Sequence, residues 1–137
     1  MIDARPVSYV IALLVAALGV TMLIPAGVAF FYGNGHGGVF LQSAAITILV
    51  GVFVALATHN VNRGGLSLHE TFLLTTGVWL ALPVFGAIPF VLGATSSTPA
   101  DAFFEAMSGL TTTGATVLEG LDELPEGRLA WRAILQW

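Results

Sequence analysis

The sequence has no cysteine and very little charge. Without cysteine, neither a disulfide framework nor a thiolate metal site is available. Only 9% of the 137 residues are charged, whereas about 25% is usual for a soluble domain. Lysine and arginine together number four, which argues against a nucleic-acid partner. The sequence also shows no nucleophile–base pair, phosphate loop or carboxylate dyad, so it does not indicate an enzyme. The spacing of three histidines matches no metal site: His36, His59 and His69.

Apolar residues take the place of the missing charge. They make up 56% of the chain, and the mean hydropathy is +0.90, which predicts a membrane protein. A helix that crosses a bilayer needs about 20 mostly apolar residues. The first candidate is longer than the apolar core of a signal peptide, about 7 to 15 residues. Its proline, Pro25, should kink it or end its regular part. The three candidate spans are residues 7–32, 39–58 and 71–92.

The connections between these spans predict a topology. Residues 33–38 are rich in glycine and should join the first two spans as an antiparallel hairpin. Arg5 precedes the first span and Arg63 lies in the connection 59–70, whereas 33–38 has no lysine or arginine. Under the positive-inside rule, the N-terminus and the second connection are cytoplasmic. Everything after the third span is then outside, including six of the eight acidic residues.

A shorter helix is predicted after the third span. Thr98 suits the N-cap, Pro99 the first helical position, and Asp101 completes a capping box with Asp in place of Glu. A helix over 99–109 would be about 16 Å long, roughly half the hydrocarbon thickness. Two interpretations remain open: an amphipathic helix on the outer surface, or a re-entrant pore helix that dips into the membrane.

The segment after this helix, "TTTGAT" at 111–116, is uncharged and small. We expect the helix to end at Gly109 and the segment to run extended with free backbone carbonyls. Irregular backbone survives at membrane depth only in protein or beside a water-filled cavity, which favours the re-entrant interpretation. Carbonyls and threonine hydroxyls could replace the hydration shell of a cation, and Gly114 permits φ > 0. The alternative is a polar helix stop before an outer loop.

The remaining sequence is acidic and then apolar. Residues 118–127 would either concentrate cations near a pore mouth or form an ordinary solvated loop. The run 128–137 begins another helix but has only ten residues, so we expect a fragment that stops inside a helix. Interfacial positions are expected for Trp131, Trp137, Arg128 and Arg132. For the two arginines the alternative is a contact with the acidic stretch or with an acidic residue of the pore helix.

The sequence resembles the Trk/Ktr/HKT superfamily, and within it the TrkH-type potassium uptake proteins. The stretch "DAFFEAMSGLTTTGATVLEGLDELP" followed by "WRAILQW" resembles their first pore loop. Two further stretches, "TMLIPAGVAFFYGNG" and "ETFLLTTGVWLALPVFGAIPF", also resemble that family. The resemblance covers essentially the whole chain, and the pore-loop stretch is its most specific part.

The resemblance implies an all-α membrane protein of the bacterial cell membrane that takes up potassium. An N-terminal transmembrane hairpin would be followed by part of a helix–pore loop–helix repeat. The hairpin would occupy 1–62 and the repeat 63–137. Within the repeat the expected parts are an outer helix 68–92, a pore helix 99–109, a filter 111–115 and an inner helix from 128.

The resemblance also implies the ion ligands and partners. Filter positions fall on Thr111, Thr112, Thr113 and Gly114, with threonine carbonyls as the main K⁺ ligands. Family members work as homodimers with cytoplasmic nucleotide-binding regulatory subunits. They have four filter loops, so this chain would supply a quarter of each carbonyl ring and need the missing pore repeats. The alternative is a structural or partner-binding membrane module without transport activity.

Overall fold

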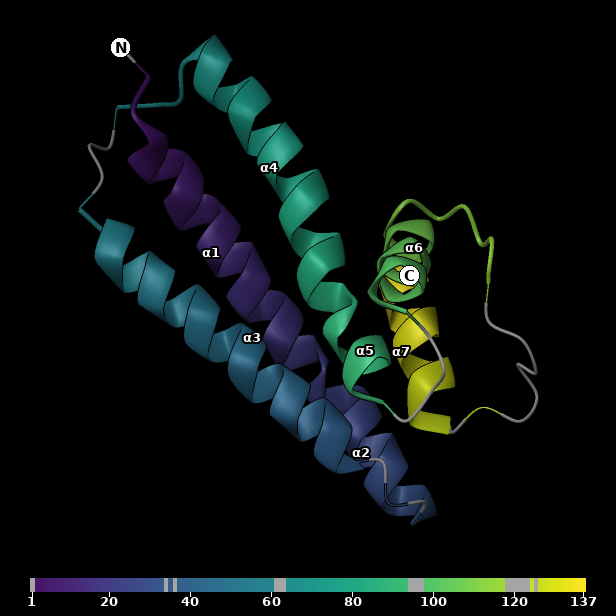
Figure 1. The fold of residues 1–137 in the computed structure, drawn as a ribbon. Helices are drawn as coiled ribbons and strands as arrows, with labels where there is room; N and C mark the ends of the chain where they lie inside the picture. The colour runs from purple at the N-terminus through teal and green to yellow at the C-terminus, as the bar shows by residue number, and fades with distance from the viewer. Residues whose placement is uncertain are drawn as a thin grey trace.

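In the computed structural model the chain is a set of helices joined by turns, and no strand occurs in its described residues (Figure 1). The all-α prediction is confirmed. The structure describes residues 2–33, 35, 37–60, 64–93, 98–117, 124 and 126–137. The helices are α1 (Ala4–Thr21), α2 (Leu23–Tyr32), α3 (Gly37–Thr58), α4 (Leu68–Gly86), α5 (Ile88–Leu92), α6 (Pro99–Leu110) and α7 (Glu126–Gln136).

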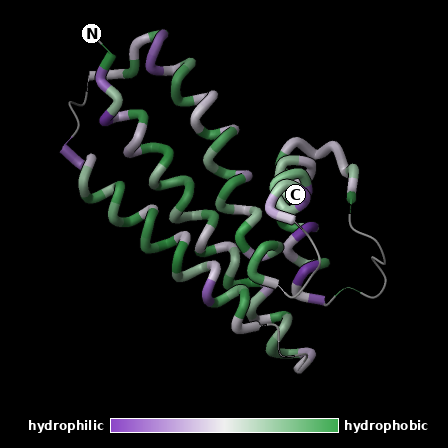
Figure 2. Tube along the Cα trace, in the orientation of Figure 1, coloured by the Kyte–Doolittle hydropathy of each residue, from purple (hydrophilic) through white to green (hydrophobic). Residues whose placement is uncertain are grey.

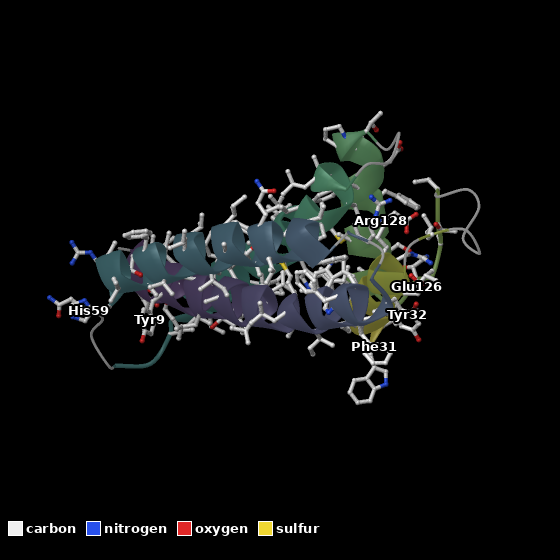
Figure 3. All side chains as sticks on the ribbon, turned by 90° about the horizontal axis from the view of Figure 1, so that it is seen from below. Tyr9, Phe31, Tyr32, His59, Glu126 and Arg128 are labelled. Atoms are coloured by element: carbon white, nitrogen blue, oxygen red, sulfur yellow. The ribbon has the colours of Figure 1, made fainter. Side chains whose placement is uncertain are left out.

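Three helical stretches are long and apolar enough to cross a membrane, as the sequence predicts: Ala4–Tyr32, Gly37–Thr58 and Leu68–Leu92. Figure 2 shows hydrophobic residues along most of their length, with most hydrophilic positions at the end that holds the N-terminus and on α7. The first two run antiparallel. Figure 3 places Tyr9 and His59 at one end of this pair, and Tyr32 with Glu126 at the other.

Small residues let α1 and α3 approach closely. A Cβ built at Gly51 would lie 2.7 Å from the backbone nitrogen of Ala16 and 2.8 Å from the carbonyl oxygen of Ala12. At Gly19 a Cβ would lie 2.7 Å from Cγ1 of Ile48. Close backbone contact of this kind is how membrane helices gain packing energy where lipid and side chains are equally apolar.

Two of the spans are interrupted near prolines. The first breaks at Met22, three residues before Pro25, which has no N–H to donate to the carbonyl of Thr21. This confirms the interruption that the sequence predicts. The third span breaks at Ala87, between α4 and α5. Pro89 lies two residues later and also has no N–H to donate.

The break at Ala87 is stabilised from another helix. The N–H of Phe90 donates to the carbonyl of Ala87 at 3.0 Å. The carbonyl of Gly86 instead accepts the indole Nε1–H of Trp131 in α7, also at 3.0 Å. A carbonyl released at a helix break is thereby satisfied inside the protein.

Trp131 corrects a prediction. We expected it in an interfacial aromatic belt, but its exposed fraction is 0%, because its indole fills the core and bonds to the break in α4–α5. Trp137, expected in the same belt, is fully exposed. The core cluster around Trp131 consists of Met22, Ala26, Phe40, Ala44, Ala87, Phe90, Ala102, Ala106 and Leu135.

The first turn of α7 packs against α2 and α3 of the N-terminal hairpin. A Cβ built at Gly127 would lie 2.9 Å from the ring of Phe40 and 3.2 Å from the carbonyl oxygen of Pro25. Helix α7 begins at Glu126, two residues before the predicted Arg128. Helices α2 and α3 share one core cluster with α6 and α7.

The third span is the least covered by the rest of the chain. Inside the protein, 17% of its most apolar window is buried, against 28% for each of the other two spans. Sequence reasoning predicts such a surface if further repeats pack there. Its large exposed side chains include Phe72, Leu73, Trp79, Leu80 and Val84.

Several sequence predictions concern residues outside the described ranges. These are the position of Arg63, that of His36, and most of the acidic stretch 118–127. The described boundary at Gly33 has the left-handed conformation, with φ 67°, that commonly ends a helix at glycine.

We expect Gly51→Ala to destabilise the protein by about 1–3 kcal/mol, because the new methyl group would push the backbones of α1 and α3 apart. The matched control is Gly38→Ala, in the first turn of the same helix, where a Cβ meets nothing within 4 Å. Unfolding in mixed micelles by titration with a denaturing detergent would measure both. Equal stability of the two variants would contradict the close contact.

Candidate functional site: the turn after the half-length helix

The half-length helix α6 begins as its sequence predicts. The Thr98 hydroxyl accepts the N–H of Asp101 at 3.2 Å, and the Asp101 carboxylate accepts the N–H of Thr98 at 3.3 Å. Pro99 occupies the first helical position. These contacts form a complete capping box, which fixes where the helix starts and so where its other end lies.

The other end of α6 differs from the prediction. The helix was expected to end at Gly109 but continues to Leu110. The N–H of Thr112 donates to the carbonyl of Gly109 at 2.9 Å, and the N–H of Thr113 donates to that of Ser108 at 3.0 Å. This pair of bonds is a Schellman motif, whose left-handed residue is here Thr112, with φ 56°.

Packing explains why Gly109 is not the terminator. A Cβ built at Gly109 would lie 2.9 Å from Cβ of Leu135 in α7. The glycine serves the close approach of the two helices. The left-handed turn then falls on a β-branched threonine, which is unusual and costs conformational energy.

The four predicted filter residues lie together on this turn, and all four are exposed. Thr111 and Thr112 form the turn itself, so the expectation of extended backbone from position 111 is wrong. Thr113 and Gly114 follow without regular secondary structure, and Gly114 has the predicted positive φ, 76°. The hydroxyl of Thr111 donates to the carbonyl of Met107 at 2.8 Å and lies 2.8 Å from that of Thr113.

The backbone carbonyls of residues 111–114 accept no hydrogen bond from the described part of the chain. They follow the C-terminal end of α6, where the aligned peptide dipoles leave partial negative charge. Oxygen dipoles in this position suit a dehydrated cation. Among the described residues, no group of three or more His, Cys, Asp or Glu side chains could hold a metal ion instead.

Ser108, in the last turns of α6, holds residues 113–115 against the helix through hydrogen bonds. Its carbonyl accepts the N–H groups of Thr113 and, at 3.4 Å, of Gly114. Its hydroxyl donates to the carbonyl of Ala115 at 2.6 Å. The donors of the turn and the first carbonyl beyond Gly114 are therefore bonded to the helix, whereas the carbonyls 111–114 are not.

Glu105 is a site residue that sequence reasoning did not single out. Its exposed fraction is 2%, and it accepts the Thr116 hydroxyl at 2.5 Å and the Val117 N–H at 2.6 Å. The other carboxylate oxygen accepts Nε of Arg132 at 3.1 Å. The sequence signal that could have identified Glu105 is an acidic residue one helical turn after Asp101, between the apolar positions 102 and 106 of the helix.

The two arginines of α7 correct the expectation of interfacial positions. Arg132 pairs with the pore-helix acid Glu105, which was the alternative interpretation. Arg128 is 4% exposed and packs against the backbone of Gly93. Its Nη2 has no hydrogen-bond partner in the part of the chain that the structure describes. Figure 3 shows Arg128 at the end of the molecule away from His59.

Comparison with known proteins points to one group. Residues 36–137 match the family model TrkH, a cation transport protein. The Trk system potassium uptake protein TrkH of Escherichia coli strain K12 is 40% identical over 134 residues, which are 97% of this chain and 28% of that protein. The Trk system potassium uptake protein TrkI of Halomonas elongata is 33% identical over 132 residues, 96% of this chain and 27% of that protein.

A more distant relative is archaeal. An uncharacterized cation transporter of Methanocaldococcus jannaschii is 30% identical over 135 residues, 98% of this chain and 28% of that protein. The chain thus spans between 27% and 28% of the length of these relatives.

The left-handed turn can be tested at Thr112. We expect Thr112→Gly to be more stable than Thr112→Ala by about 1 kcal/mol, because only glycine adopts positive φ without a Cβ penalty. At the neighbouring Thr113, whose φ is not positive, the order should reverse. The unfolding free energies of the four variants would test this order. If Thr112→Ala is more stable than Thr112→Gly, the assigned conformation is refuted.

Proposed function

The chain belongs to the TrkH family of cation transport proteins, and from this premise we propose that it forms part of a potassium uptake protein. In this proposal, residues 111–114 supply one quarter of a ring of oxygens through which K⁺ passes. The ligands are the backbone carbonyls of Thr111, Thr112 and Thr113, with Gly114 setting the backbone geometry. Potassium is the transported ion rather than a resident cofactor.

One observation carries the proposal: four consecutive carbonyls accept no hydrogen bond within the described residues, while the backbone N–H groups beside them and the Ala115 carbonyl are bonded to α6. A polar helix stop would need neither this arrangement nor the buried Glu105 behind it. Irregular backbone after a half-length helix suits a water-filled ion pathway. Charge selection would come from carbonyl and hydroxyl dipoles, because residues 107–117 carry no charged side chain.

The remaining parts of the proposal concern the whole protein. The ring would be completed by further pore repeats, which would cover the exposed face of α4. Residues 1–62 would form the N-terminal hairpin and 63–137 the first pore repeat. Figure 1 supports the proposed sidedness, because the N-terminus, the end of α3 and the start of α4 lie at one end of the molecule. That end would be cytoplasmic. The turn formed by residues 111–114, here called the filter turn, would face outward.

The resemblance to the family suggests the assembly. A homodimer would bind cytoplasmic nucleotide-binding regulatory subunits that gate transport. None of these partners would contact residues 111–114 from the outer side, so ion selection by the turn and regulation from the cytoplasm would be separable in experiments.

Uptake of ⁸⁶Rb⁺ and ²²Na⁺ into liposomes that contain the full-length gene product tests the function. We expect selective uptake, and we expect Gly114→Ser to lower the Rb⁺/Na⁺ ratio about tenfold, equivalent to about 1.4 kcal/mol. The reason is that serine disfavours φ 76° and would turn the neighbouring carbonyls away.

Gly35→Ser is the matched control for this experiment. Gly35 has nearly the same φ, 74°, and a Cβ there meets nothing within 4 Å, but it lies between α2 and α3. Its variant should keep the wild-type ratio. Unchanged selectivity in Gly114→Ser would refute the filter, and absence of any cation uptake would favour a structural or partner-binding module.

A further inference from the structure

We propose that Glu105 is a positioning residue for ion selectivity, which holds the backbone just beyond the filter turn in place through Thr116, Val117 and Arg132. This inference rests on the proposed filter function of residues 111–114. Glu105 itself touches no ion in this arrangement. It acts through the chain segment that it binds.

The carboxylate joins three parts of the structure. It belongs to α6, it receives the Thr116 hydroxyl and Val117 N–H from the segment after the turn, and it receives Nε of Arg132 from α7. One oxygen, Oε1, takes both bonds from the segment, and Oε2 takes the arginine. A carboxylate that accepts donors on both oxygens has little freedom to rotate, so it fixes the three parts relative to one another.

Burial makes this arrangement specific. The Glu105 side chain is 1% exposed, whereas that of Arg132 is 23% exposed. An ionised carboxylate with so little water around it needs charged or polar donors, and it strongly favours the geometry that supplies all of them. Any displacement of residues 116–117 from α6 would leave a buried charge with fewer donors.

The filter turn depends on this attachment because, in the part of the chain that the structure describes, its own carbonyls accept no hydrogen bond. On its N-terminal side, Ser108 holds the N–H groups of Thr113 and Gly114. On its C-terminal side, the segment is held by the Ser108–Ala115 bond and by the two bonds to Glu105. Loss of the Glu105 bonds would let the backbone after Gly114 shift, and the preceding carbonyls would shift with it. Selection between cations depends on the positions of such dipoles.

The most direct test changes Thr116, which is exposed and whose hydroxyl is one of the donors to Glu105. Thr116→Val has the same shape but no hydroxyl, whereas Thr116→Ser keeps the hydroxyl. In the full-length protein in liposomes, we expect Thr116→Val to lower the Rb⁺/Na⁺ uptake ratio about threefold to tenfold, the range for loss of one hydrogen bond. Thr116→Ser should keep the wild-type ratio. Wild-type selectivity in both variants would overturn the proposal.

Glu105→Gln provides the second test. The amide has one acceptor oxygen and one donor nitrogen, so in either orientation its NH2 faces the donors of Thr116 and Val117 or Nε of Arg132, and we expect a larger drop in the ratio than in Thr116→Val. Asp101→Asn is the matched control, because it removes one charge from the same helix and keeps a capping side chain. The amount of monodisperse protein is measured for every variant. If Glu105→Gln does not fold, the comparison of Thr116→Val with Thr116→Ser decides whether the proposal stands.

Gly114→Ser separates this inference from the proposed function. If Gly114→Ser relaxes selectivity but Thr116→Val and Glu105→Gln do not, the filter stands and the positioning role of Glu105 is refuted. If none of the three changes selectivity, the filter itself is refuted. A parallel loss of total flux and protein amount with an unchanged ratio would show a purely structural role and would also overturn the proposal.

Discussion

The structure depends on one constraint: a backbone polar group away from water must find its partner in the protein. At the break between α4 and α5, the Gly86 carbonyl meets this requirement with the indole of Trp131. Next to residues 111–114, Ser108 and Glu105 meet it for the Ala115 carbonyl and the Val117 N–H. The carbonyls of residues 111–114 stand out against this background. Within the described residues they accept no hydrogen bond, whereas the N–H groups of residues 112–114 and the carbonyl of Ala115 are bonded to α6.

The site is assembled from two helices, α6 and α7, together with the segment that follows α6. The capping box places the start of α6, and the close approach of α7 at Gly109 places its end. Arg132 then brings a positive charge from α7 to the buried carboxylate of Glu105. Helix packing, the turn and the ion pair therefore reinforce one geometry.

Local and compositional signals in the sequence predicted much of this fold. Span length and hydropathy identified the three long helices, and the Thr98–Asp101 pair identified the start of α6. Predictions failed where the decisive partner is distant in sequence. Trp131 and Arg132 look interfacial until α7 is docked against α4 and α6. Gly109 looks like a helix terminator until Leu135 is seen to occupy the space a Cβ would need. The positive φ of Gly114 was predictable, whereas that of Thr112 was not, because β-branched residues rarely adopt it.

The contact between Gly127 and the hairpin has a consequence for how the protein is made. The hairpin leaves the ribosome long before α7, so the surface formed by Phe40 and the Pro25 carbonyl must remain without its final neighbour during synthesis. The α1–α3 pair is joined by close backbone contacts that need no residue after position 58. The surface on which Gly127 rests is therefore built entirely from residues that are synthesised before α7.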